Sequence, residues 1–106
     1  MIRVMIESPY AGEVDKNRKY LQECIRHSIS LKEAPFASHQ MYTDALNDNN
    51  YTERTTGINA GYEWMEWVIY VIFYIDYGMS KGMHLALNKA IKLNKDIVFR
   101  KLRKGE

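Results

Sequence analysis

The chain is poor in cysteine and has no sequence feature that would carry it out of the cell or into a membrane. Cys24 is the one cysteine among 106 residues, so no internal disulfide can form and a reducing compartment is favoured. Arg3 and Glu7 interrupt the apolar N-terminus, which does not read as a signal peptide. The apolar run from Val68 to Ile75 is far shorter than the roughly 20 residues of a membrane helix. We expect a cytoplasmic protein without a membrane partner.

Metal-ligating side chains and basic clusters are also scarce. With one cysteine and three scattered histidines, the sequence predicts no metal site, and no cofactor is expected. The formal charge of +2 comes mostly from the tail, where Arg100, Lys101, Arg103 and Lys104 cluster without interleaved aromatic residues. A basic footprint this weak is typical of a solvated tail, so nucleic-acid binding is not expected.

The most informative feature present is the run Val68 to Ile75 followed directly by the polar segment Asp76 to Met83. Eight β-branched and aromatic residues have the length of a strand buried on both faces, and a helical pattern begins after the glycine-bearing segment. Such a junction is where open α/β sheets place their ligands. We expect residues 1–106 to form one domain that binds a small polar or anionic molecule there.

The remaining pattern alternates strands with helices. Strands are predicted at Ile2 to Ile6, Ala34 to Ser38, Val68 to Ile75 and Ile97 to Phe99. Helices are predicted from Val14 to Leu31 with Asp15 as cap, from Thr52 to Trp67, and from Ser80 to Leu93 with Asn94 as a left-handed stop. Right-handed crossovers then give an α/β fold, a small Rossmann-like or flavodoxin-like three-layer domain with a four-stranded parallel sheet in the order 2-1-3-4.

In that order the turns after the first and third strands face one crevice. The ligand-binding candidates around it are Ser8, Pro9, Tyr10, Gly12, His39, Arg54, Asp76, Gly78, Ser80, Gly82 and Met83. Several also have a purely structural interpretation. Asp76 can cap a helix or bond its own turn, the glycines can serve turn geometry, and Arg54 can form an exposed ion pair.

Several motifs together resemble a known family. They are Ser8-Pro9-Tyr10, Ala34-Pro35-Phe36-Ala37-Ser38-His39, Glu53-Arg54 with Gly57-Ile58-Asn59-Ala60-Gly61, and Asp76-Tyr77-Gly78-Met79-Ser80-Lys81-Gly82-Met83. In this order they resemble the small phage and bacterial branch of the nucleoside 2-deoxyribosyltransferase-like superfamily. The resemblance implies that a glutamate in the helix after the third strand attacks the anomeric carbon of a nucleoside, with Tyr10 and Asp76 supporting the site.

This chain departs from that pattern at the nucleophile. The matching position is Ala86, and the segment from Ser80 to Leu93 contains neither Asp nor Glu. A covalent glycosyl intermediate needs a carboxylate, which alanine cannot supply. If catalysis survives, Glu7 or Asp76 is the candidate catalytic carboxylate, with Glu53 a further possibility.

Three hypotheses follow. The first is a protein that binds a nucleoside or nucleotide without turning it over, for example a phage protein in the host cytoplasm that sequesters a nucleotide signal of host defence. The second is an N-glycosidase or deoxyribosyltransferase that uses a relocated carboxylate. The third is a non-catalytic scaffold for protein interaction. The many large aromatic residues, among them Trp64 and Trp67, also predict a homo-oligomer, a dimer or higher.

Overall fold

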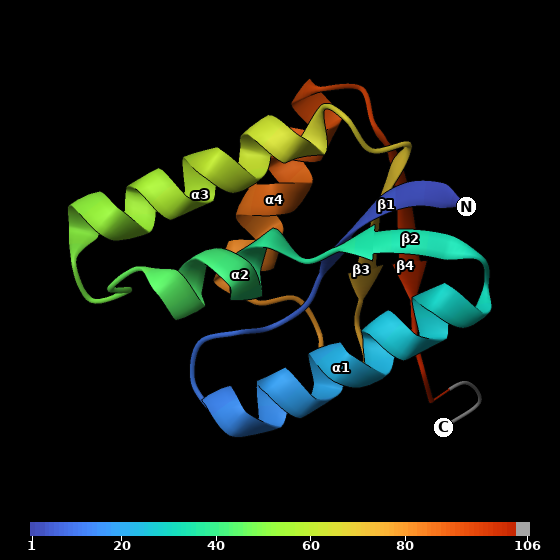
Figure 1. Cartoon of the computed structure of the whole chain (residues 1–106), viewed down its shortest axis with the longest axis horizontal. Coiled ribbons are helices and arrows are strands. Elements are labelled where there is room, and N and C mark those ends of the chain that lie inside the picture. The colour runs from blue at the N-terminus through green and yellow to red at the C-terminus, as the bar shows by residue number, and fades with distance from the viewer. Residues whose placement is uncertain (104–106) are drawn as a thin grey trace.

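The computed structural model of the protein describes residues 1–103, and Lys104 of the basic tail lies outside them. Helices and strands alternate through most of the chain (Figure 1). In order, the elements are β1 (Ile2–Glu7), α1 (Val14–Ser30), β2 (Glu33–Phe36), α2 (Ser38–Ala45), α3 (Tyr51–Met65), β3 (Tyr70–Tyr74), α4 (Lys81–Lys92) and β4 (Asp96–Arg100).

The sheet confirms the predicted topology. Its four strands are all parallel and lie in the order β2-β1-β3-β4. β3 is central, as expected of its apolar run, although only residues 70–74 of the predicted Val68–Ile75 belong to the strand. Glu7, the last residue of β1, lies opposite Phe73 of β3.

Alternation along the strands divides the core into two layers. Met5, Val71 and Phe73 point to the face covered by α3 and α4, whereas Ile6 and Tyr74 point to the face covered by α1. Successive side chains of a strand face opposite sides of the sheet, so Glu7 shares the α3/α4 face with Met5. The fold is therefore a three-layer α/β domain, as the sequence predicted.

Local sequence explains where α1 and α4 lie. α1 buries Tyr20, Leu21 and Cys24 at the expected three-four spacing. Asp15 is not its cap, because Glu13 occupies that position and makes no side-chain cap hydrogen bond. Ser80 caps α4 as predicted, since its Oγ accepts a hydrogen bond from Met83 N at 3.2 Å.

The last turn of α4 is partly open to solvent, and its Ile91 is 56% exposed. The chain leaves α4 at Asn94, whose φ of 55° confirms the left-handed stop.

The helix α2 was not predicted. The sequence pattern indicated a strand over Ala34 to Ser38, but β2 ends at Phe36 and Ser38 already begins α2. α2 packs closely on α3 at two glycines. A Cβ added at Gly61 would lie 2.7 Å from Ser38 Oγ, and one at Gly57 would lie 3.2 Å from Tyr42 Cβ. These two glycines therefore let α2 lie against α3, above the carboxyl end of β1.

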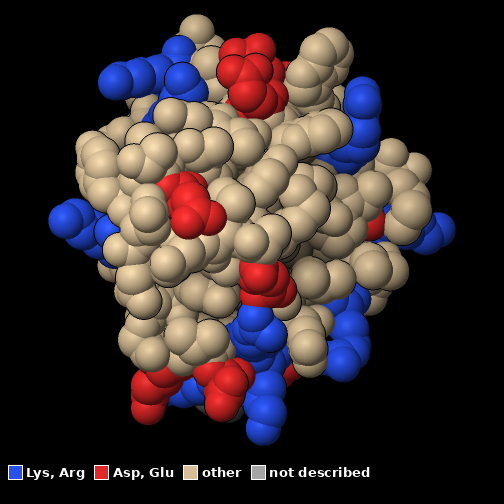
Figure 2. All heavy atoms as spheres, turned by 60° about the vertical axis from the view of Figure 1, so that its left-hand side comes forward, with Lys and Arg blue, Asp and Glu red and all other residues tan. Residues whose placement is uncertain are grey.

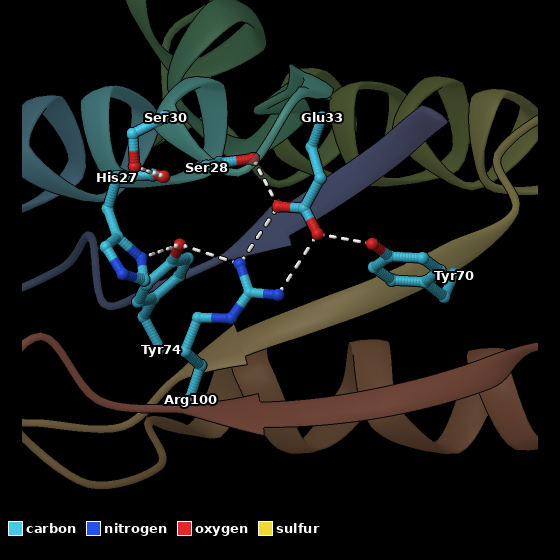
Figure 3. A network of polar contacts seen from close by, with 7 residues as sticks. All are labelled: His27, Ser28, Ser30, Glu33, Tyr70, Tyr74 and Arg100. Carbon is cyan, nitrogen blue, oxygen red and sulfur yellow. Dashed lines mark hydrogen bonds and ion pairs between the residues drawn. The ribbon is translucent and has the colours of Figure 1, made fainter. Parts of the chain in front are cut away.

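A polar network fixes the opposite face of the sheet (Figure 3). The Glu33 carboxylate accepts hydrogen bonds from Ser28 at 2.7 Å, from Arg100 at 2.9 and 3.1 Å, and from Tyr70. Burial alone would raise the pKa of Glu33, but Arg100, Tyr70 and Ser28 outweigh it and lower the pKa to about 2. Arg100 also donates to Tyr74 at 3.1 Å. The carboxylate and the guanidinium thus satisfy each other and join the two edge strands to α1.

Candidate functional site

A pocket lies at the carboxyl end of β1, between α2, α3 and the start of α4. Its cavity volume is about 200 Å³. Predicted site residues that line it are Ser8, Tyr10, His39, Arg54, Ser80, Gly82 and Met83, and the candidate carboxylate Glu7 lines it too. These residues come together at the carboxyl end of β1, on the face of the sheet away from α1.

Glu7 is the carboxyl at the floor of the pocket. The residue is 7% exposed, and none of residues 1–103 forms a hydrogen bond or ion pair with its carboxyl. Burial raises the pKa of Glu7 to about 8, because the charged form loses its hydration without gaining a partner. At neutral pH this side chain is mostly a carboxylic acid, which can donate as well as accept a hydrogen bond.

Ser8 and His39 form a second polar pair in the pocket. Ser8 Oγ lies 2.9 Å from His39 Nε2, which ties the end of β1 to the first turn of α2. Burial lowers the pKa of His39 to about 4, so the imidazole is neutral over most of the pH range. The other ring nitrogen, Nδ1, is buried without a hydrogen-bond partner among the described residues.

The mouth of the pocket carries two cations, Arg54 and Lys81, together with the acidic residues Asp48 and Glu53. Arg54 lies in the first turn of α3 and Lys81 begins α4, and both side chains are exposed. The first N–H groups of a helix have no intrahelical acceptor and carry partial positive charge. At Gly82 an added Cβ would meet nothing within 4 Å, so the space above this helix start is open. The arrangement suits an anionic group such as a phosphate or carboxylate.

Aromatic side chains line the walls. Tyr10 follows β1, Tyr42 comes from α2, and Tyr62 comes from α3. Burial, and then the Glu7 carboxyl, raise the pKa of Tyr62, and both residues line the pocket. With Met83, which is 1% exposed, these rings offer flat apolar surfaces to a ligand.

Asp76, predicted as a ligand-binding residue, does not line this pocket. Tyr20 donates to Asp76 Oδ1 at 2.5 Å, and the N–H groups of Leu102 and Arg103 donate to its carboxylate at 2.9 and 3.0 Å. Burial by itself would raise the pKa of Asp76, but these hydrogen bonds hold the pKa below its ordinary value. The reason is the strand alternation: Asp76 comes two residues after Tyr74, on the α1 face.

Three further predicted residues lie outside the pocket lining, namely Pro9, Gly12 and Gly78. Gly12 and Gly78 have φ angles of 92° and 78°, a conformation that favours glycine. The N–H of Gly78 donates to Ile75 O at 3.0 Å, which closes a turn after β3. Both glycines therefore serve the backbone of the loops that flank the site.

Sequence reasoning missed Tyr42 and Thr43 because it missed α2. Both line the pocket, and they lie three and four residues after His39. That spacing puts them on the same helical face as His39, so a helix beginning at Ser38 would have revealed them. Among the described residues, no group of three or more His, Cys, Asp or Glu side chains is placed to hold a metal ion. No helix in residues 1–103 is long and apolar enough to cross a bilayer.

Comparison with solved structures finds a protein with a similar fold. The chain resembles the structure of the 2-deoxyribosyltransferase from the psychrotolerant bacterium Bacillus psychrosaccharolyticus, with a TM-score of 0.75 and 17% sequence identity. The match covers 98% of this chain and 74% of that protein. At this identity the likeness concerns the fold. No curated protein matches the sequence. Residues 2–100 match the model of a domain of unknown function, DUF7768, and the chain therefore belongs to the DUF7768 family.

Proposed function

We propose that the pocket binds a nucleoside or a nucleotide-derived ligand and does not turn it over efficiently. The observation that carries the proposal is the placement of Arg54 and Lys81 at the mouth beside a helix start, with tyrosine rings lining the interior. Asp48 and Glu53 also line the pocket, so the anionic group is expected on the side of the two cations. Such a site suits a ligand with an anionic end and a flat end. The fold likeness to a 2-deoxyribosyltransferase supports a ligand of the nucleoside class.

The size of the cavity limits the ligand. Pockets for drug-sized molecules usually have volumes of about 300 to 1,000 Å³, and the volume here is about 200 Å³. A nucleoside, with any phosphate at the open mouth, suits this space better than a dinucleotide held entirely inside. Lys81 and Arg54 are both exposed, so they can reach a phosphate in the mouth.

The absence of efficient turnover follows from two positions in the same pocket. Ala86, where the resemblance places the nucleophile, is 3% exposed and lines the pocket without a functional group. Glu7 provides a carboxyl, but with a pKa of about 8 it is mostly protonated at neutral pH. A nucleophile must be ionised to attack the anomeric carbon, so Glu7 is a poor replacement.

Calorimetry on the whole chain tests the proposal. Titration with the deoxynucleoside monophosphates, the parent nucleosides and cyclic or ADP-ribose-type nucleotides should find at least one ligand. Arg54→Gln should weaken a bound monophosphate about tenfold, because it removes a charge-assisted contact. Arg26→Gln removes the same charge from the exposed side of α1 and should leave affinity unchanged. Absence of binding by any nucleoside or nucleotide would overturn the proposal and favour a scaffold.

Hydrolysis of an N-glycosidic bond is a second candidate, favoured by the protonated state of Glu7. A general acid must hold a proton near neutral pH, and burial gives Glu7 this property. Glu7 would protonate the base as the C–N bond breaks, and water would add to the sugar carbon and return its proton to Glu7. Chromatography of a deoxynucleoside incubated with the protein decides between the candidates. Base release that Glu7→Gln abolishes would establish hydrolysis.

Binding without turnover points to sequestration as the biological role. For a protein of a phage, a nucleotide signal of host defence is a ligand of the required chemistry. Binding this nucleotide would lower its free concentration and so block the defence response. Expression in a bacterial host that carries such a defence tests this role. Arg54→Gln should lose protection together with ligand affinity, whereas Arg26→Gln should keep both.

Self-association is a separate proposal, carried by an exposed apolar surface around the start of the sheet. Trp64, Trp67 and Ile69 are 50%, 66% and 54% exposed, and Trp64 stacks at 5.5 Å on Phe36 of the edge strand β2. Figure 2 brings the left-hand side of Figure 1 forward and shows that acidic and basic side chains there lie mostly around a largely uncharged area. A second copy of the chain would cover this aromatic surface.

A further inference from the structure

The floor of the pocket lacks the partner that a buried carboxyl requires. A polar group taken out of water without a hydrogen bond destabilises the folded protein. Glu7 is almost fully buried, and residues 1–103 give its carboxyl no hydrogen bond or ion pair. Unlike Glu33, which Arg100 neutralises on the other face, Glu7 is left to be satisfied by something that enters the pocket.

His39 presents a second unsatisfied atom to the same pocket. Its Nε2 is engaged with Ser8, and its Nδ1 is buried without a partner in the described part of the chain. Depending on the tautomer, Nδ1 either donates or accepts. The pocket therefore holds one buried ring nitrogen without a partner, on α2, and the unpaired Glu7 carboxyl on β1, whose oxygens stay open to the pocket space. A single ligand can reach both groups.

The charged groups that face Glu7 show which end of a ligand fits there. The cations stand at the mouth, where Arg54 and Lys81 are exposed. A phosphate at the floor would meet a carboxyl with no compensating cation, which is unfavourable in a buried site. The titratable and charged groups that line the pocket with Glu7 are His39 and Tyr42 from α2, Glu53, Arg54 and Tyr62 from α3, and Lys81 from α4, with Tyr10 and Asp48 on the loops.

We infer that the floor of the pocket recognises the uncharged end of the ligand, through the Glu7 carboxyl and the His39 ring, while the anionic end lies at the mouth. The group recognised must both donate and accept hydrogen bonds, which describes the edge of a nucleobase or the hydroxyls of a sugar. This inference rests on the proposed function and adds the orientation of the ligand and two specificity residues. Both side chains are neutral between about pH 4 and about pH 8.

The experiment uses the deoxynucleoside monophosphate that binds best to the wild-type chain, with its nucleoside and 2-deoxyribose 5-phosphate, at pH 7 and pH 9. At pH 9 Glu7 is mostly ionised in the free protein, so the wild-type affinity should fall about tenfold from its value at pH 7. Glu7→Gln keeps a neutral donor and acceptor, so it should bind within about threefold of wild type and lose the pH dependence.

Three further variants separate recognition at the floor from recognition at the mouth. Glu7→Leu should bind at least about tenfold more weakly at pH 7, because it cannot form the hydrogen bond. His39→Phe should weaken binding but keep the pH dependence. Arg54→Gln should weaken the monophosphate, leave the nucleoside unchanged and keep the pH dependence. If Glu7→Leu weakens only ligands with a base, the base lies at the floor. If it also weakens 2-deoxyribose 5-phosphate, the sugar does.

The two proposals fail in different ways. If no nucleotide or nucleoside binds the wild-type chain, the proposed function fails and the inference with it. If a nucleotide binds but Glu7→Leu leaves its affinity unchanged, or if the wild-type affinity rises between pH 7 and pH 9, the inference alone is wrong. A rise with pH would mean that an ionised Glu7 accepts from the ligand.

Discussion

Replacing Glu7 by glutamine should stabilise the protein, and the gain should depend on pH. In the folded chain burial raises the pKa of Glu7 from its ordinary 4.5 to about 8. Between these values the unfolded chain has released the proton and the folded chain still holds it. The stability of the wild-type protein therefore falls as pH rises from about 4.5 to about 8, and it levels off above.

The magnitude follows from the same two values. The difference between 4.5 and about 8, at 1.36 kcal/mol for each pKa unit, corresponds to about 5 kcal/mol. Relaxation and water entry into the pocket reduce this, so we expect Glu7→Gln to gain roughly 2 to 5 kcal/mol at pH 9 and almost nothing below pH 4.5. This is a large effect, because domains of this size are stable by about 5 to 15 kcal/mol in total.

Urea unfolding followed by tryptophan fluorescence at pH 4.5, 7 and 9 measures the gain. Glu63→Gln is the matched control: it removes a carboxyl from an exposed position of α3 and should show no comparable change with pH. An equal stability of Glu7→Gln and wild type at pH 9 would falsify the burial of an unpartnered carboxyl, and with it the account of the pocket floor.

Four other substitutions test the packing of α2 on α3, the role of Asp76 and the aromatic surface. Gly61→Ala should lower the free energy of unfolding by about 1 to 3 kcal/mol in urea, because the new Cβ would lie 2.7 Å from Ser38 Oγ. Gly82→Ala is the matched control: its Cβ would meet nothing within 4 Å, so it should raise the free energy of unfolding by up to about 1 kcal/mol. Above pH 4, Asp76→Asn should lower the free energy of unfolding by about 1 to 3 kcal/mol. The difference from wild type should shrink at lower pH, because the pKa of Asp76 is depressed and the wild-type carboxylate becomes protonated there. Nucleotide affinity should be unchanged. The wild type should be a dimer or higher in light scattering at micromolar concentration, and Trp67→Gln should shift it toward monomer.

Most of the fold could be predicted from the sequence because strong periodic signals agree with the tertiary structure. The apolar run around Val71 is long enough to mark a central strand, and Ser80 and Asn94 mark the two ends of α4 by their own chemistry. α2 could not be predicted in the same way. Its eight residues carry a weak apolar pattern, and it is held by glycines of α3, which are distant in the sequence.

The site could be predicted only to the correct end of the sheet. Position after a strand indicates which edge of a parallel sheet a residue occupies. On this basis Ser8, Tyr10 and Ser80 were expected at one crevice, and all three line the pocket. Position after a strand does not indicate on which face of the sheet the side chain lies. Asp76 follows β3 as Glu7 ends β1, yet the two carboxyls lie on opposite sides of the sheet.

Strand alternation would have decided between the two carboxyls. Glu7 is two residues after Met5, and Met5 packs against α4, so the alternation of β1 directs Glu7 to the helical layer that contains Ala86. In β3 the same alternation directs Asp76 with Tyr74 to α1. The carboxyl that α4 lacks at Ala86 is therefore matched, in the same pocket, by one carried on the neighbouring strand. Because that carboxyl is buried without a cation, it retains its proton, and this protonated state favours recognition of a ligand over covalent attack on it.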